Sequence, residues 1–128
     1  MMTPELFRLD KRLALITGSS GGIGFALARG LAQSGATVIL NGRNADKLEA
    51  AATELRAESL NVHTRAFDAS DATAVQTAID EIESTLGAID ILINNAGMQR
   101  RAPLEDFTTE HWHELMRTNV DSVFLVGQ

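Results

Sequence analysis

The sequence contains no cysteine and no tyrosine, and it has only two prolines and one tryptophan. Without cysteine there is no disulfide bond, no thiolate nucleophile and no zinc site built on thiolates. No apolar run approaches the roughly 20 residues that a helix needs to cross a bilayer. The segment Met1–Glu5 also lacks the basic and apolar regions of a secretory signal. We therefore expect a soluble, cytoplasmic protein with no membrane partner.

Basic residues are in the minority. The 11 lysines and arginines stand against 17 aspartates and glutamates, which gives a formal net charge of −6. Proteins that bind nucleic acid carry a basic patch, so this balance argues against a nucleic-acid partner. Hydrophobic residues make up 45% and charged residues 22% of the 128, which is the composition of an ordinary folded domain. The length suffices for one such domain.

Four short apolar segments predict β-strands. The runs Leu13–Ile16, Val38–Leu40 and Ile89–Ile93 are typical of strands buried on both faces, whereas Asn61–Phe67 alternates and is expected nearer the sheet edge. Longer segments with helical spacing separate these runs. The alternation predicts an α/β fold, a doubly wound parallel sheet in the order 3-2-1-4 with helices on both faces.

Three apolar stripes at helical spacing are expected to face the core. They consist of Ile23, Ala26, Leu27, Gly30 and Leu31; of Leu48, Ala51, Ala52 and Leu55; and of Val75, Ala78, Ile79, Ile82 and Leu86. The left-handed position that follows a helix is expected at Gly35, Asn61 and Gly87. The third helix is expected to be capped by Ser70 or Asp71, and a fourth by Thr108 or Thr109. The fourth helix is expected to bend near Asn119.

The sharpest motif is the glycine-rich run Thr17–Gly24, which directly follows a strand and opens a helix. Gly18 allows a tight turn, Gly22 lets the backbone approach a pyrophosphate, and Gly24 lets the helix pack close to the sheet. Amides at the start of the helix would then point at the phosphates. No Lys-Ser or Lys-Thr pair follows the last glycine, which excludes a P-loop. The alternative is a glycine-rich loop without a ligand.

The end of the second strand distinguishes NAD from NADP. Proteins that bind NAD carry an acidic residue there, which bonds the ribose 2′-hydroxyl. This chain has Asn41 at that place, and Arg43 stands two residues later, where it could meet a 2′-phosphate. NADP is therefore favoured over NAD. The alternative is that Arg43 is an ordinary solvated charge.

Four motifs together resemble the short-chain dehydrogenase/reductase family. They are Thr17–Gly24 as Thr-Gly-xxx-Gly-x-Gly, Asp68 after the third strand, Asn94–Gly97 after the fourth, and Asn119-Val120 in the last helix. They lie in the family's order and at its spacing over roughly Leu9–Gln128. The resemblance implies an NADP-dependent oxidoreductase that passes a hydride between nicotinamide and a secondary alcohol or ketone.

The resemblance also implies a set of cofactor-binding residues. Asp68 would accept a hydrogen bond from the adenine amino group, or cap a helix, or both, and Asn95 would brace the central strand. Many NADP-dependent members carry a basic residue where this chain has Gly21, so Arg43 must supply that charge alone. The full set is Gly18, Ser19, Ser20, Gly22, Ile23, Asn41, Arg43, Asp68, Ala69, Asn95, Ala96 and Gly97.

Asn119 resembles the first member of the family's catalytic Asn-Ser-Tyr-Lys tetrad. The chain has no tyrosine, so the serine and the Tyr-xxx-Lys segment are expected beyond Gln128. The apolar segment Val123–Gln128 ends without a cap or a return strand, and four strands with an uncovered edge make a poor isolated domain. We therefore expect residues 1–128 to be a dinucleotide-binding domain, cut before the catalytic segment of a longer protein.

Within the family, the run Asn94–Arg101 and the segment Phe124–Val126 resemble the gluconate 5-dehydrogenases. This resemblance implies a sugar-acid substrate, D-gluconate or 5-keto-D-gluconate. Arg100 and Arg101 would clamp its carboxylate, or else face solvent or a subunit interface. The family commonly forms tetramers through helices in this region, so a homotetramer is expected for the full-length protein.

Three other functions remain open at this stage. A 3-oxoacyl-carrier-protein reductase has the same first half, and a chain that truly ended at Gln128 would be a non-catalytic dinucleotide-binding module. A flavodoxin-like fold is disfavoured by the pairing of the glycine turn with Asn94–Gly97. The pair His111 and His113 predicts no metal site, because residues two apart on a helix diverge.

Overall fold

Four parallel strands form one sheet in the computed structural model, which describes residues 3–128. They are β1 (Leu13–Ile16), β2 (Thr37–Gly42), β3 (Val62–Ala66) and β4 (Ile91–Ile93). Their order is β3-β2-β1-β4, which confirms the predicted 3-2-1-4 arrangement. Of the predicted domain 1–128, only Met1 and Met2 lie outside the described residues.

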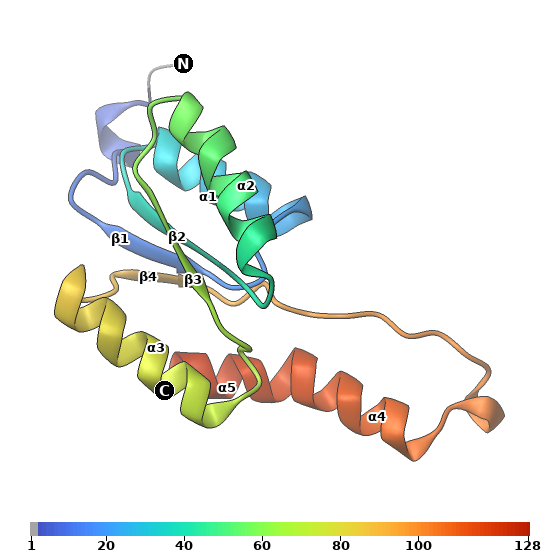
Figure 1. Ribbon diagram of the computed structural model, residues 1–128. Coiled ribbons are helices and arrows are strands. Elements are labelled where there is room, and N and C mark those ends of the chain that lie inside the picture. Colours follow the sequence, from blue (N-terminus) through green and yellow to red (C-terminus); the bar gives the residue numbers. More distant parts are fainter. Residues whose placement is uncertain (1–2) are drawn as a thin grey trace.

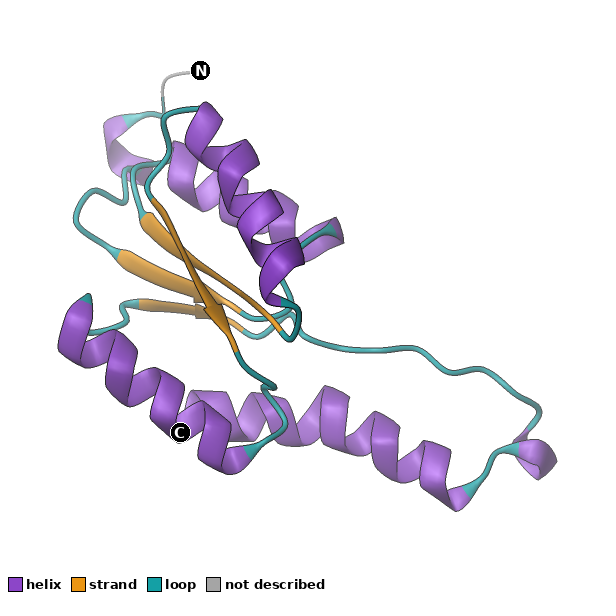
Figure 2. Ribbon diagram, in the orientation of Figure 1, coloured by secondary structure: helices purple, strands orange, loops and turns teal. Residues whose placement is uncertain are grey.

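The helices cover both faces of the sheet (Figures 1 and 2). On one face, α1 (Gly22–Gln33) and α2 (Ala45–Ala57) pack on the side chains of Ala14 and Ile16. On the other, α3 (Ala72–Thr85) and α5 (Ser122–Gly127) pack on Leu13 and Leu15. Successive residues of a strand point to opposite faces, so the continuous apolar run of β1 serves both layers.

A long helical segment ends the chain. It consists of α4 (Thr109–Met116), one π-helical turn (Arg117–Asp121) and α5. At the place where a bend was predicted, near Asn119, the segment has a π turn, in which one extra residue is accommodated. Short 3₁₀ turns occur at Glu5–Phe7 and Leu104–Asp106.

The two edge strands, β3 and β4, differ in how well their position and burial agree with the sequence prediction. β3 lies at an edge of the sheet, as its alternating pattern predicts. The run that forms β4 is expected to be buried on both faces, but all three of its residues are half-buried. Among residues 3–128, β4 pairs only with β1, so its other side has no neighbouring strand.

The apolar stripe predicted for α1 is wrong for most of its residues, although Leu31 does pack against the core. Ile23 is 75% exposed and Leu27 is 41% exposed, whereas the buried residues of the helix are Gly24, Ala28 and Ala32. The latter recur every fourth residue and have little or no side chain, so the helix backbone approaches the sheet closely. A hydrophobicity pattern gives more weight to Ile and Leu than to Gly and Ala, and it therefore selects the opposite face. The stripes predicted for α2 and α3 face the core.

Most of the predicted helix ends are confirmed. Gly35 and Gly87 have φ angles of +107° and +110° after α1 and α3. Asp71 and Thr108 cap α3 and α4 by accepting a hydrogen bond from a backbone amide three residues on. The prediction for Asn61 is wrong, because α2 ends at Ala57 and Ser59 takes the left-handed conformation.

Candidate functional site

The glycine turn between β1 and α1 has the geometry that the sequence predicts. Gly18 has a φ of +61°, and a Cβ added there would lie 2.9 Å from the Cα of Ala96. Gly22 has a φ of +60° with nothing within 4 Å of an added Cβ, so the space beside it is open. At Gly24 an added Cβ would lie 2.5 Å from the Gly18 carbonyl oxygen. The absence of a side chain at Gly18 and Gly24 therefore lets the turn pack closely against Asn95 and Ala96, while Gly22 faces free space.

Ser19 and Asn41 hold this turn from inside the protein. Ser19 is fully buried, and its Oγ donates to the Ile16 carbonyl (2.6 Å) and accepts from the Asn41 amide (3.0 Å). Asn41 Oδ1 accepts from the Gly18 amide (3.2 Å). Asn41 Nδ2 donates to the carbonyls of Arg65 and Phe67, at 3.2 and 3.1 Å.

Ser19 and Asn41 are two of the predicted cofactor-binding residues, and in this structure their side chains bind the protein's own backbone. Every polar side-chain atom of Ser19 and Asn41 is bonded to the protein's own backbone. Asn41 still forms part of a cavity wall, but its amide joins the glycine turn to the end of β3. Both residues therefore shape the site by holding its backbone in place.

Thr17 and Asn95 join the turn to the end of β4. Thr17 Oγ1 accepts hydrogen bonds from the amides of Asn95 (3.0 Å) and Ala96 (2.9 Å). Asn95 Nδ2 donates to the Gly18 carbonyl (3.0 Å). Asn95 thus ties β4 to the turn after the neighbouring β1. The part played by the Thr17 hydroxyl was not predicted, because a threonine at a strand end has no distinctive sequence signal.

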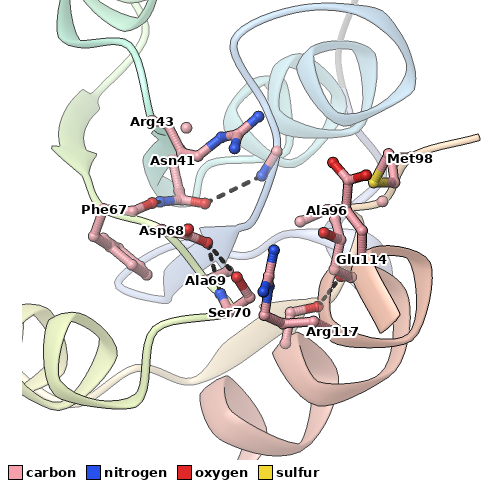
Figure 3. Close-up of a pocket in the computed structure, with 15 residues that line it drawn as sticks. Asn41, Arg43, Phe67, Asp68, Ala69, Ser70, Ala96, Met98, Glu114 and Arg117 are labelled. Carbon is pink, nitrogen blue, oxygen red and sulfur yellow. Dashed lines mark hydrogen bonds between the residues drawn. The ribbon is translucent and has the colours of Figure 1, made fainter. Parts of the chain in front are cut away.

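A cavity of about 270 Å³ lies where the carboxyl ends of the strands meet α4 and the π turn (Figure 3). It brings together seven of the predicted residues: Gly18, Asn41, Arg43, Asp68, Ala69, Ala96 and Gly97. Its wall also contains residues that sequence reasoning missed, among them Phe67, Ser70, Met98, Glu114, Arg117 and Thr118. Ser20 lies with Arg43 and Lys47 in an adjoining surface hollow. Ligands of open α/β sheets bind at this end of the strands.

Asp68 is a fixed carboxylate in this cavity. Its Oδ1 accepts hydrogen bonds from the Ser70 hydroxyl (2.7 Å) and the Ser70 amide (2.9 Å). The Ser70 hydroxyl, followed by its amide and the charges of Arg43 and Arg117, lowers the pKa of Asp68 against the opposing effect of partial burial. The side chain is therefore ionised at neutral pH. Within residues 3–128 its Oδ2 has no hydrogen-bond donor, so that oxygen is free to accept one.

Asn119 lies in the π turn and holds the loop that follows β4. Its Oδ1 accepts from the Met98 amide (2.7 Å), and its Nδ2 donates to the Met98 carbonyl (3.0 Å). A Cβ added at Gly97 would lie 3.1 Å from the same Oδ1. The side chain predicted to be catalytic is therefore bonded to backbone in this structure, and it fixes the course of the loop.

Arg100 and Arg101 do not converge on the cavity. Arg100 pairs with Glu114 Oε2 at 2.7 Å, and neither arginine belongs to the cavity wall. The loop that carries them runs away from the sheet toward the start of α4 (Figure 1). The predicted clamp is thus not assembled here, because the carboxylate that Arg100 meets is one of the protein's own.

Two further kinds of site are absent from residues 3–128. No three His, Asp or Glu side chains gather as they would around a metal ion. No helix there has both the length and the apolar character of a membrane span.

Known proteins resemble this chain in sequence and in fold. A profile of the short chain dehydrogenase family matches residues 12–128. The gluconate 5-dehydrogenase of Gluconobacter oxydans (strain 621H) is 54% identical over 128 residues, which are 100% of this chain and 50% of that protein. The 5-keto-D-gluconate 5-reductase of Escherichia coli (strain K12) is 40% identical over 124 residues, 97% of this chain and 49% of that protein.

Among solved structures, a gluconate 5-dehydrogenase from Burkholderia cenocepacia J2315 in complex with NADP and tartrate is 53% identical. It superposes with a TM-score of 0.91 and covers 95% of this chain and 48% of that one. The chain therefore spans about half the length of these relatives.

Proposed function

The chain belongs to the short-chain dehydrogenase family, and from this membership we propose that it is the dinucleotide-binding part of an NADP-dependent oxidoreductase. Bound NADP would accept a hydride from a secondary alcohol, or NADPH would give one to a ketone. The observation that carries the proposal is the cavity between the glycine turn, Asp68 and Arg43. A similar chain of 53% identity has been solved with NADP bound.

The residues present fit such a cofactor. Gly22 and Ile23 begin α1, where backbone amides have no acceptor within the helix, and the open space at Gly22 leaves room for phosphates. Asp68 offers Oδ2 to the adenine amino group. No carboxylate stands at the end of β2, and Arg43 makes no ion pair within residues 3–128, so it is available to a 2′-phosphate.

We propose a sugar acid, D-gluconate or 5-keto-D-gluconate, as the substrate of the whole protein. Two relatives are named for gluconate and 5-keto-D-gluconate. The chain matches half or less of the length of each of them. Arg100 and Arg101 remain our candidates for the substrate carboxylate, and Arg100 would then have to exchange its present partner, Glu114, for the substrate. Asn119 is a positioning residue in this proposal, because it acts through the loop at Met98.

We also propose that the whole protein is a cytoplasmic homotetramer. Exposed apolar side chains gather along α4, the π turn and α5: Trp112, Met116, Val120, Val123 and Phe124. Patches of this kind mark interfaces between proteins. Light scattering on the whole protein should therefore give four times the mass of one chain, and a monomer in solution would contradict the assembly.

Arg43→Asp in the whole protein should abolish the preference for NADP. A carboxylate at that position repels the 2′-phosphate and removes its partner, which we expect to lower kcat/KM for NADP about 100-fold. The value for NAD should hardly change. The measurement is the rate of NADPH or NADH formation with D-gluconate. Lys11→Asp is the matched control, since it changes the net charge equally on an exposed residue that is not part of the cavity wall.

Three outcomes would count against parts of this proposal. Equal rates with NAD and NADP in the parent would remove the role given to Arg43. An equal loss in the Lys11→Asp variant would show that only the net charge matters. Binding of NADP without turnover of D-gluconate or 5-keto-D-gluconate would keep the cofactor and exclude the substrate.

A further inference from the structure

Arg117 is a cation of the cavity to which neither the sequence motifs nor the comparisons assign a role. It is the first residue of the π turn, and its side chain points into the cavity toward Asp68 and Ser70 (Figure 3). Within residues 3–128 it makes no ion pair. π turns inside α-helices are frequent at functional sites, and Arg117 stands at the start of this one.

One of the two acids on the cavity wall is already paired with another arginine. Glu114 lies on the same wall of the cavity, three residues earlier in the helical segment, and it pairs with Arg100 at 2.7 Å. Asp68 stands on the opposite wall with Oδ1 occupied by Ser70 and Oδ2 free among the described residues. The cavity therefore presents a planar cation on one side and an open acceptor on the other.

The wall near these two groups is partly apolar, although Ser70 also belongs to it. Phe67 and Ala69 flank Asp68 and are both buried. A ligand that matches all these features is flat, aromatic and equipped with an amino donor on its edge. An adenine ring has this combination, whereas a sugar or a phosphate lacks the aromatic face.

We propose that Arg117 binds the adenine ring of the dinucleotide by stacking its guanidinium plane on the base, while Asp68 accepts the hydrogen bond of the amino group. This inference rests on the proposed function and adds a second cation to the site. A guanidinium stacks on aromatic faces through its plane as well as its charge, and arginine planes serve as stacking surfaces for bases. An ammonium group supplies the charge without the plane.

Arg117 and Arg43 then have separate tasks, which binding measurements distinguish. Arg43 lies between the cavity and the adjoining hollow with Ser20 and Lys47, where it would meet the 2′-phosphate. Arg117 would meet the base itself. Loss of Arg117 should therefore weaken all ligands that contain adenosine, and loss of Arg43 only those that carry the 2′-phosphate.

The test is calorimetric titration of the whole protein with 5′-AMP, with adenosine 2′,5′-bisphosphate and with nicotinamide mononucleotide. Arg117→Ala should raise the Kd of both adenosine ligands about tenfold, the effect of removing one stacking partner of a base. Arg117→Lys should recover little of this loss, and neither variant should change the Kd of nicotinamide mononucleotide. Arg43→Ala should weaken the bisphosphate and leave 5′-AMP unchanged.

Failure of this inference is separable from failure of the proposed function. A parent protein that binds none of the adenosine ligands would overturn the proposed function. A parent that binds 5′-AMP with the same Kd as its Arg117→Ala variant would overturn the role of Arg117 alone. Full recovery by Arg117→Lys would also overturn it, because charge without stacking would then explain the effect.

Discussion

Replacing Gly24 by alanine should lower the free energy of unfolding of the whole protein by about 2–4 kcal/mol. The new Cβ would lie 2.5 Å from both the Gly18 carbonyl oxygen and Asn95 Nδ2. Overpacking of this kind costs about 1–3 kcal/mol, and the hydrogen bond between those two atoms would be disturbed as well. Urea denaturation measures the change. Dinucleotide affinity should fall too, since the same two residues hold the glycine turn.

Gly30→Ala is the matched control on the same helix. Nothing lies within 4 Å of a Cβ added at Gly30, so the substitution gains helix propensity without a clash. We expect it to raise the free energy of unfolding by about 0.5–1 kcal/mol. Opposite signs for the two glycines would establish close packing as the reason for Gly24. A stabilised Gly24→Ala variant would show that the turn has room for a methyl group.

Asn41→Leu should lower the free energy of unfolding by about 3–5 kcal/mol. The side chain is 1% exposed and makes three hydrogen bonds, one to the Gly18 amide and two to carbonyls at the end of β3. Leucine has a similar size but leaves those three backbone groups without a partner. Each buried group left unpaired costs about 1–3 kcal/mol.

Asn61→Leu is a suitable comparison in urea denaturation, since Asn61 is exposed just before β3. We expect a change within about 0.5 kcal/mol there. Asn41→Asp should destabilise the protein too, because a carboxylate would face the carbonyls of Arg65 and Phe67. If Asn41→Leu unfolded at the parent's urea concentration, the bonds around Asn41 would have no energetic role.

The sequence predicted the sheet well because its signals are local. Each apolar run is recognised from a few consecutive residues, and each glycine of the turn from the backbone conformation that its own position requires. Gly18 and Gly22 both have positive φ angles, which residues with a side chain rarely adopt. The caps at Asp71 and Thr108 likewise depend on an amide only three residues away.

The features that the sequence did not predict depend on partners that are distant in the chain. Asn41 bonds the turn at Gly18 and the backbone beyond Arg65, and nothing in its neighbourhood along the sequence reveals this. Arg100 turns to Glu114, which lies on another element. The buried face of α1 is decided by how closely Gly24 can approach Asn95. These outcomes depend on tertiary geometry, which apolar spacing alone does not encode.

The π turn lets one helical segment place some side chains in the cavity and others in the core, which a regular α-helix of this sequence could not do. In an α-helix each residue turns the chain by about 100°, so one extra residue changes the direction of every side chain after it. Upstream, Glu114 and Arg117 face the cavity, and downstream Ser122 and Val126 are buried, with Val126 packed in the core under α3. Deleting one residue within Arg117–Asp121 would leave a continuous helix whose two ends could no longer both be correctly aimed.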